Sequence, residues 1–285
     1  MKALIIGKSG QVAWELMQTC PDDITASCYG RDDLNILDLH AIEALVAEQK
    51  PQVIINASAY TAVDKAETEQ EQAFAINGTA VENLAIVAKQ HSARLIHIST
   101  DFVFDGQSTS PYKVDDVPNP INVYGASKLA GENAVKNHYP ENAAIVRTSW
   151  VYSTHGNNFV KTMLRLIAEK ESLNVVSDQI GSPTYAKGLA AYLWYLAKSE
   201  QVDLMNHYSD LGVASWYDFA VAIQDIAFQK GVLSKKIPIS PISTSQYPTP
   251  AKRPKFSLLE KQEGIGEMLY WKAALKEMLE DLCKR

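Results

Sequence analysis

The chain has 285 residues, of which 46% are hydrophobic and 21% are charged, and its formal net charge is −6. This composition is sufficient for one large or two small hydrophobic cores. A nucleic-acid-binding protein would usually carry a basic stripe, so the acidic balance argues against such a partner. It does not exclude a phosphate ligand, because a helix N-terminus and a few cations are enough to bind one.

The three cysteines, Cys20, Cys28 and Cys283, are too few and too scattered for a disulfide framework or a zinc cluster. Residues 1–10 contain only a short apolar run, unlike a signal peptide. No stretch reaches the roughly eighteen apolar residues that a membrane helix needs. We therefore expect a cytoplasmic protein with neither a membrane nor a nucleic acid as partner.

Short apolar runs and helical patterns alternate along the first half of the chain. In chain order they predict a strand at 3–7, a helix at 11–19, a strand at 24–29, a helix at 40–49, a strand at 52–58, a helix at 69–90, a strand at 93–99, a helix at 123–137 and a strand at 143–149. Continuous apolar runs are typical of strands that are buried on both faces. Strands alternating with helices imply right-handed crossovers. The pattern predicts an α/β fold with a Rossmann-type, doubly wound parallel sheet.

The C-terminal part has a different character. It carries more proline, especially at residues 238–254, and its strand signals are shorter. We expect residues 1–155 to form the sheet domain. Residues 156–285 should form mainly a smaller α/β region, with some of the chain crossing back to the sheet.

A glycine-containing turn, GKSGQVA at residues 7–13, follows the first predicted strand and opens the first helix. A dinucleotide-binding turn has this context. Gly7 permits the tight turn, Gly10 lets the backbone approach a pyrophosphate, and the helix N-terminus presents free N–H groups. The alternative is a turn that merely needs glycines. The place of residues 7–13 in a βαβ pattern favours dinucleotide binding, so we expect residues 1–155 to form a dinucleotide-binding domain.

The end of the second predicted strand bears on the choice of cofactor. An acidic residue there would bind the ribose 2′-hydroxyl. This chain has Arg31 instead, followed by Asp32 and Asp33. Because an arginine can accommodate a 2′-phosphate, we expect NADPH in preference to NADH. A solvated loop charge is the alternative interpretation of Arg31.

Tyr124 and Lys128 stand four residues apart at the start of a predicted helix, so they share one face. A free tyrosine has a pKa of about 10, and a neighbouring ammonium favours the phenolate. The pair therefore suits general acid–base chemistry, although this spacing alone is usually structural.

Ser99, Thr100 and Asp101 follow the fourth predicted strand. Ligands of open α/β sheets bind beyond the carboxyl ends of the strands, so a hydroxyl there can align a substrate oxygen with Tyr124. A helix cap or turn is the alternative for these residues. The glycine turn, Thr100 and the Tyr124–Lys128 pair occur together in one chain order, which favours a catalytic site.

These residues resemble the extended short-chain dehydrogenase/reductases and, within them, the dTDP-4-dehydrorhamnose reductase family. The resemblance covers nearly the whole chain and is carried by GKSGQVAWEL, NASAYTAVDKAE, STDFVFDG, NVYGASKLAGE, RTSWVY, GNNFVKTMLRL, DQIGSPT and YPTPAKRP. It implies reduction of dTDP-4-dehydro-L-rhamnose to dTDP-L-rhamnose by hydride from NADPH or NADH. Residues 156–285 would then mainly bind the dTDP-sugar.

The resemblance also implies roles for single residues. Tyr124 would donate a proton to the C4 oxygen, Lys128 would hold the nicotinamide ribose and lower the tyrosine pKa, and Thr100 would hydrogen-bond the reacting oxygen. The other residues implied in cofactor binding are Gly7, Gly10, Gln11, Val12, Arg31, Asp38, Leu39, Ala57, Ala59 and Tyr60. Those implied in substrate binding, besides Thr100, are Asp101, Trp150, Asn157, Asn158, Gln179 and Arg253. Trp150 could instead be a core aromatic, and the two asparagines could cap a helix.

Some similar reductases hold a magnesium ion between subunits with glutamates. Glu15 is present here, but the second position is Lys187, which cannot ligate a hard cation. We therefore expect no metal site, and the homodimer that the family suggests loses one means of assembly.

Two other functions stay open. An epimerase would retain its cofactor through turnover, and a dehydratase would carry more acidic residues beside Thr100, where Phe102 follows Asp101. A non-catalytic protein, like the regulatory subunit of methionine adenosyltransferase, would not need Thr100, Tyr124 and Lys128.

Overall fold

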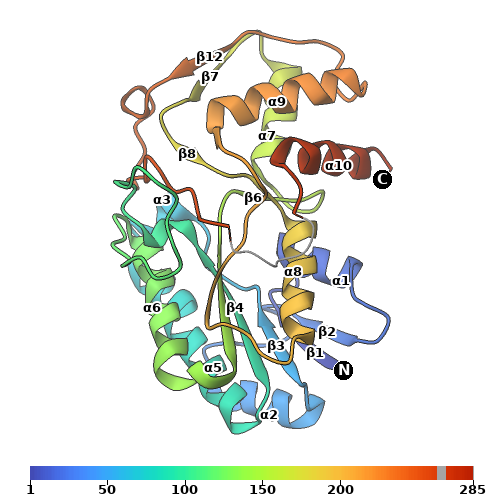
Figure 1. The fold of residues 1–285 in the computed structure, drawn as a ribbon, viewed down its shortest axis with the longest axis vertical. Helices are drawn as coiled ribbons and strands as arrows, with labels where there is room; N and C mark the ends of the chain where they lie inside the picture. The colour runs from blue at the N-terminus through green and yellow to red at the C-terminus, as the bar shows by residue number, and fades with distance from the viewer. Residues whose placement is uncertain (262–267, 285) are drawn as a thin grey trace.

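The computed structural model describes residues 1–261 and 268–284 (Figure 1). Its first elements are β1 (Lys2–Ile6), α1 (Gln11–Gln18), β2 (Thr25–Tyr29), α2 (Leu39–Gln49), β3 (Val53–Asn56), α3 (Val63–Ala66), α4 (Gln70–Phe74), η1 (Ala75–Thr79), α5 (Ala80–Gln90), β4 (Arg94–Thr100), η2 (Asp101–Val103), α6 (Val123–His138), η3 (Pro140–Asn142) and β5 (Ala143–Thr148). The later elements are β6 (Val151–Tyr152), α7 (Phe159–Glu169), β7 (Leu173–Val176), β8 (Ile180–Gly181), β9 (Thr184–Tyr185), α8 (Ala186–Lys198), β10 (Met205–His207), β11 (Ala214–Ser215), α9 (Trp216–Gln229), β12 (Ile239–Ile242), η4 (Thr244–Gln246) and α10 (Trp271–Cys283).

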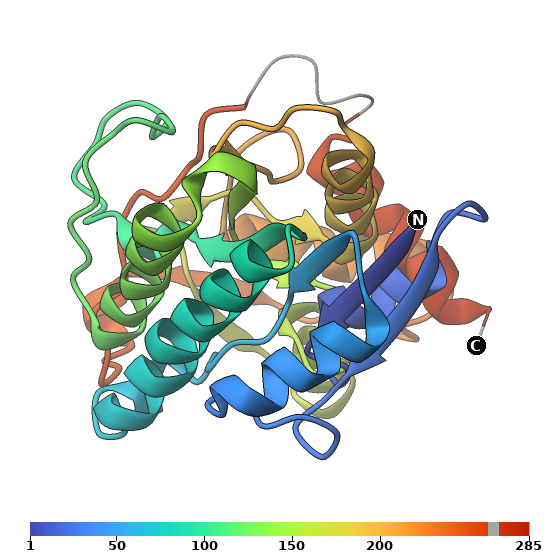
Figure 2. The same ribbon diagram turned by 90° about the horizontal axis from the view of Figure 1, so that it is seen from below.

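The central sheet has six strands in the order β10-β5-β4-β3-β1-β2, and all its pairings are parallel. Helices α2, α5 and α6 cover one face, and α1 and α8 cover the other (Figure 2). The chain reverses its direction of strand addition between β1 and β3, which is where ligands bind in such sheets. The predicted doubly wound α/β fold is confirmed.

The strands form where the sequence is continuously apolar, because both faces of the sheet are covered. Leu4 and Ile6 pack toward one side of the sheet and Ile5 toward the other, and all three are almost completely buried. The five predicted strands and the predicted helices of this half are present, with ends shifted by a few residues.

The predicted helix at 69–90 contains an unexpected wide turn. The π-helical turn η1 separates α4 from α5. Asn77, in this turn, is buried and bonds the backbone N–H and carbonyl of Tyr60 as well as the Ser127 hydroxyl. Such single turns are frequent at functional sites.

The C-terminal region is built differently from the sheet. Its strands pair in twos (β11 with β8, β12 with β7, β6 with β9), and α7, α9 and α10 enclose a separate core (Figure 1). Helix α8 and strand β10 return to the main sheet, so the chain crosses back as drawn in Figure 1. The boundary at residue 155 remains a prediction, and residues 262–267 and 285 lie outside the described part.

Candidate active site

The turn after β1 is shaped for a phosphate group. Gly7 has φ = 117°, and a Cβ on it would lie 2.7 Å from the Ala57 carbonyl oxygen at the end of β3. Gly10 is the N-cap of α1, yet no side chain caps this end and its first turn has no acidic residue. Free N–H groups with a positive helix end fit a pyrophosphate, so the residues present suit a dinucleotide.

The remaining predicted cofactor residues line the same edge. Tyr60 is held by Asn77, and its hydroxyl donates to Glu69 at 2.5 Å. Ala57 and Ala59 lie half-buried in the loop after β3. Val12 packs against the core beside β1, and Gln11 lies 3.5 Å from the Val151 carbonyl.

The loop after β2 carries Arg31 and contacts Lys8 of the glycine turn. Arg31 is exposed, while Asp33 accepts from the Gly30 N–H at 2.9 Å and pairs with Lys8 at 3.2 Å. The bond to Gly30 shapes the turn, so Asp33 has a structural role there. The Asp38 carboxylate caps α2 by accepting from the Ala41 N–H, which gives Asp38 a structural role; the predicted cofactor contacts of Asp38 and Leu39 stay predictions.

Tyr124 and Thr100 meet at the carboxyl end of β4, and they share a hydrogen bond. Helix α6 can approach because residue 125 is glycine: a Cβ there would collide with the Phe102 carbonyl. Thr100 donates to Asp101 at 3.0 Å and accepts from the Phe102 N–H at 3.2 Å. The structure therefore brings the predicted Thr100, Asp101 and Tyr124 together.

The pKa values in this cluster are set mainly by burial. Burial raises the pKa of Tyr124 to about 12, against the lowering effect of the Thr100 hydrogen bond. Burial also raises the pKa of Asp101 to about 6, although Ser257 and Thr100 bond its carboxylate. Burial, Thr100 and Asp101 are the causes of the Tyr124 shift in the protein alone, so the expectation that Lys128 lowers this pKa stays a prediction.

Lys128 is almost completely buried one turn along α6 from Tyr124. Its ammonium nitrogen donates to the Ile98 carbonyl at 2.7 Å and lies 3.5 Å from His97 Nε2. Burial lowers the pKa of Lys128 to about 8, while Glu132 opposes that change.

A buried ion pair links the elements that carry the site. Arg147 on β5 and Glu132 on α6 form two hydrogen bonds of 2.8 and 2.7 Å, and both side chains are nearly inaccessible. Ser99 donates to the same carboxylate at 2.6 Å. Burial alone would raise the pKa of Glu132, but the bonds and charge of Arg147 hold it below the ordinary value. The pair ties α6 to β4 and β5, on which the site stands.

The predicted substrate residues spread over the edge between the sheet and the C-terminal region. Trp150 has φ = 47° and stacks on Trp216 with centroids 3.7 Å apart. Asn158 caps α7 and donates to Gln11 at 2.9 Å. Its neighbour Asn157 is exposed.

Two further predicted substrate residues are engaged within the chain. Gln179 donates to the Thr244 hydroxyl at 3.1 Å. Arg253 pairs with Asp64 at 2.8 Å. This ion pair links α3 to the segment before Phe256, which forms an isolated β-bridge with Ile180. These internal bonds do not test the predicted substrate contacts of Gln179 and Arg253, which stay predictions.

Several residues that shape the site were missed or undervalued in the sequence. Glu67 accepts from the Val123 N–H at 2.9 Å and so caps the helix that carries Tyr124. His97 and Arg147 interrupt otherwise apolar strands, and this interruption is a signal that could have singled them out. Trp216 carries no local signal.

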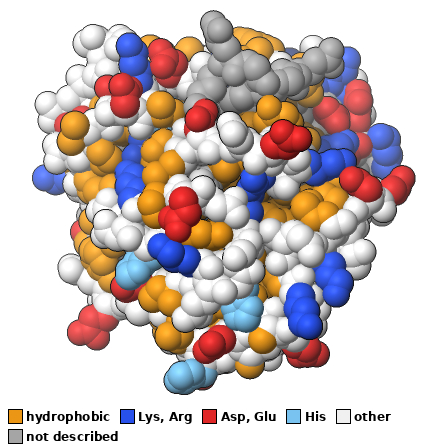
Figure 3. All heavy atoms as spheres, turned by 60° about the horizontal axis from the view of Figure 1, so that its bottom comes forward, with side chains coloured by type: hydrophobic (Ala, Val, Ile, Leu, Met, Phe, Trp, Pro, Cys, Tyr) orange, Lys and Arg blue, Asp and Glu red, His pale blue; other side chains and the backbone are white. Residues whose placement is uncertain are grey.

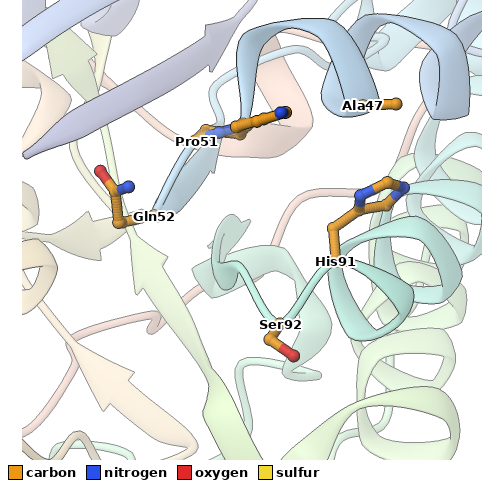
Figure 4. Close-up of a pocket in the computed structure, with 6 residues that line it drawn as sticks. Ala47, Pro51, Gln52, His91 and Ser92 are labelled. Atoms are coloured by element: carbon orange, nitrogen blue, oxygen red, sulfur yellow. The ribbon is translucent and has the colours of Figure 1, made fainter.

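Four other features lie outside the catalytic cluster. Lys187 pairs with Glu277 at 2.7 Å and Asp281 at 2.9 Å, so this position holds a cation of its own. A hollow of about 590 Å³ beside Ala47, Pro51, Gln52, His91 and Ser92 lies at the amino ends of β3 and β4, away from Tyr124 (Figure 4). Figure 3 shows acidic and basic side chains interspersed on one face. Among the described residues, no helix has the length and apolarity to cross a membrane.

The parallel sheet, the uncapped glycine turn and the Thr100, Tyr124 and Lys128 set together define a short-chain dehydrogenase/reductase. A family model described as the RmlD substrate binding domain matches residues 1–284. A dTDP-4-dehydrorhamnose reductase of Salmonella typhimurium is 39% identical over 302 residues, which cover 99% of this chain and 98% of the relative. The chain belongs to this family of dTDP-4-dehydrorhamnose reductases, as its motifs predicted.

Solved structures agree with this assignment. The crystal structure of a dTDP-4-dehydrorhamnose reductase from Bacillus anthracis, in complex with NADP, has a TM-score of 0.91 and 36% identity, and the match covers 98% of this chain and 99% of that one. A structure of the same kind of enzyme from Clostridium acetobutylicum has a TM-score of 0.93 and 38% identity, with 100% of both chains covered.

Proposed function

We propose that this chain reduces dTDP-4-dehydro-L-rhamnose to dTDP-L-rhamnose with NADPH, and uses NADH less well. The observation that carries the proposal is the convergence of Thr100, Tyr124 and Lys128 at the carboxyl edge of the sheet, next to the uncapped end of α1. The names of the relatives and the NADP in the Bacillus anthracis structure support the substrate and the cofactor.

When bound, NADPH supplies the hydride for this chemistry. Tyr124 holds the proton that the sugar C4 oxygen needs: with its pKa raised to about 12, the phenol stays protonated until a charged oxygen develops beside it. The hydroxyl of Thr100 orients that oxygen and stabilises the developing charge, since hydrogen bonds act strongly in a site removed from water. Lys128, behind Tyr124, would hold the nicotinamide ribose.

Binding is shared between the two regions. The N-terminus of α1, with Gly10, Gln11 and Val12, would hold the pyrophosphate, and Arg31 with Lys8 would face a 2′-phosphate. The remaining predicted cofactor residues would lie along the adenine and ribose. Asp101, Trp150, Asn157, Asn158, Gln179 and Arg253 would surround the dTDP-sugar.

We place the enzyme in the cytoplasm and propose that it forms a homodimer without a metal. The ion pairs of Lys187 with Glu277 and Asp281 support a dimer without a metal, because the ammonium neutralises carboxylates that could otherwise attract a cation. Sedimentation equilibrium with and without EDTA tests the dimer and its independence of a metal. A monomer, or a dimer that EDTA dissociates, contradicts the proposal.

The test of function is an assay with purified protein, dTDP-4-dehydro-L-rhamnose and either NADPH or NADH. Loss of the reduced-nicotinamide absorbance should match the dTDP-L-rhamnose formed, mole for mole. Arg31→Ala should reduce the preference for NADPH, with Arg165→Ala, an exposed arginine on α7, as control. Sugar conversion without cofactor consumption would point to an epimerase instead.

A further inference from the structure

A buried histidine stands behind the catalytic lysine. His97 is in β4, is completely buried, and has one ring nitrogen toward β3 and the other toward α6. Nδ1 lies 3.1 Å from the amide nitrogen of Asn56, and Nε2 lies 3.5 Å from Nζ of Lys128. The His97 imidazole is therefore close enough to influence the charge state of Lys128.

The orientation of Asn56 fixes which ring nitrogen carries the proton. Asn56 Oδ1 accepts from the Ser58 backbone N–H at 3.1 Å and from the Ser58 hydroxyl at 2.6 Å. A backbone N–H can only donate, so the oxygen must face Ser58 and the NH₂ must face His97. Nδ1 of His97 therefore accepts, and in a neutral ring the proton resides on Nε2.

The ring is neutral for two reasons. Burial lowers the pKa of His97 well below its ordinary value, and the charge of Lys128 lowers it further. The Nε2–H group consequently points toward Lys128, whose own N–H donates to the Ile98 carbonyl at 2.7 Å. An ammonium has only donors, whereas an uncharged amine has a lone pair that can face Nε2–H.

We propose that His97 is a positioning residue for the reduction: locked by Asn56, its Nε2–H stabilises the amine form of Lys128, so that Lys128 can return a proton to Tyr124. This inference rests on the proposed function. After Tyr124 has protonated the sugar oxygen, its phenolate takes a proton from the Lys128 ammonium. One O–H bond forms and one N–H bond breaks, and the amine later regains a proton from water.

The other charges around Lys128 are compatible with this role. Glu132, one turn along α6, favours the ammonium, but Arg147 and Lys136 pair with its carboxylate at 2.7 and 3.6 Å. Asp101 faces Tyr124 rather than Lys128 and disfavours the phenolate, which promotes its reprotonation. Burial also lowers the pKa of Lys128.

The first test measures the tautomer directly. Nitrogen-15 NMR of histidine-labelled wild-type protein should show His97 as a neutral ring protonated at Nε2, from slightly acid to slightly alkaline pH. A proton on Nδ1, or an imidazolium near pH 7, would overturn the proposal. This measurement needs no substrate, so its outcome is independent of whether the protein reduces a dTDP-sugar.

The second test reverses the tautomer with Asn56→Asp. The carboxylate keeps an acceptor for Ser58 but can no longer donate to Nδ1, so His97 should move its proton to Nδ1 and offer a lone pair to Lys128. Carbon-13 NMR of the lysine ε-carbon should then show the Lys128 titration about one pH unit higher, a tenfold change in the ratio of ammonium to amine. The pH profile of kcat should move in the same direction.

The double variant His97→Leu/Asn56→Asp controls for the charge of the new carboxylate, because an equal rise of the Lys128 titration there would contradict a role of His97. Asn206→Asp controls for a carboxylate elsewhere in the sheet. Asn206 is also a buried asparagine of the same sheet, in β10, where it accepts from Tyr192 and donates to the Asp203 carbonyl. Its replacement should leave both the His97 tautomer and the Lys128 titration unchanged. If Asn56→Asp reverses the tautomer while the Lys128 titration stays in place, His97 does not set the charge state of Lys128.

Discussion

The edge of the sheet and the C-terminal region are stabilised by different interactions. At the sheet edge, charged and polar side chains such as Glu132, Arg147 and Lys128 are buried and hydrogen-bonded to one another or to backbone. In the C-terminal region the strands have two to four residues, and the core contains stacked or tilted aromatic rings such as Phe159 and Phe219 at 5.5 Å. The proposed chemistry thus lies at a polar, tightly connected edge, and we propose that the aromatic region binds the sugar-nucleotide.

The difference has an energetic consequence. A buried charge that loses its partner is left unsatisfied at high cost, so the sheet edge should respond sharply to single substitutions. An aromatic core loses contact area in proportion to the atoms removed, so the C-terminal region should respond gradually. The following substitutions test this contrast.

The largest effect should come from Tyr124→Phe, which removes the proton donor and leaves the packing against Phe102 in place. Positioned general acids contribute roughly 10²- to 10⁴-fold, so kcat should fall by about that factor. Cofactor binding, measured by fluorescence titration with NADPH, should change little. A variant with normal turnover would exclude Tyr124 as the acid.

Arg147→Met should lower the free energy of unfolding by about 3–5 kcal/mol, because Glu132 stays buried without its main partner. Urea denaturation measures the change. The double variant Arg147→Met/Glu132→Leu is the control, and it should recover much of the loss. Equal loss in both variants would contradict a penalty that arises from an unpaired charge.

Asp101→Asn should make stability less dependent on pH. Burial raises the folded-state pKa of Asp101 from 3.8 to about 6, so its stabilising contribution is complete below 3.8 and is lost as the pH rises through 6. Relative to wild type, the variant should therefore gain up to about 3 kcal/mol between pH 4 and pH 7.5. Thermal and urea unfolding across this range would show it, and parallel pH profiles of the two proteins would refute it.

Phe219→Leu, in the aromatic core, should cost only about 1 kcal/mol, because a buried apolar side chain is replaced by a smaller one of similar character. Urea denaturation of this variant beside Arg147→Met compares the two regions directly. A loss as large as that of Arg147→Met would remove the proposed contrast.

The α/β alternation, the glycine turn and the Tyr124–Lys128 pair could be predicted before any fold was known, because they depend on local periodicity and short spacing. Apolar runs indicate strands, and a separation of four residues places two side chains on one helical face, whatever the surroundings. The family resemblance added the substrate class through motifs spread over most of the chain.

The distant residues that complete the site could be identified only from the packing of the fold. The neighbouring positions of β3, β4 and α6 bring Asn56, His97 and Lys128 together, and no spacing along the chain encodes that contact. The stacking of Trp150 on Trp216 likewise joins two separate parts of the chain. The pKa directions of Tyr124 and Lys128 also emerge only in the fold, because burial, which sets them, is a property of the packed molecule rather than of the residue type.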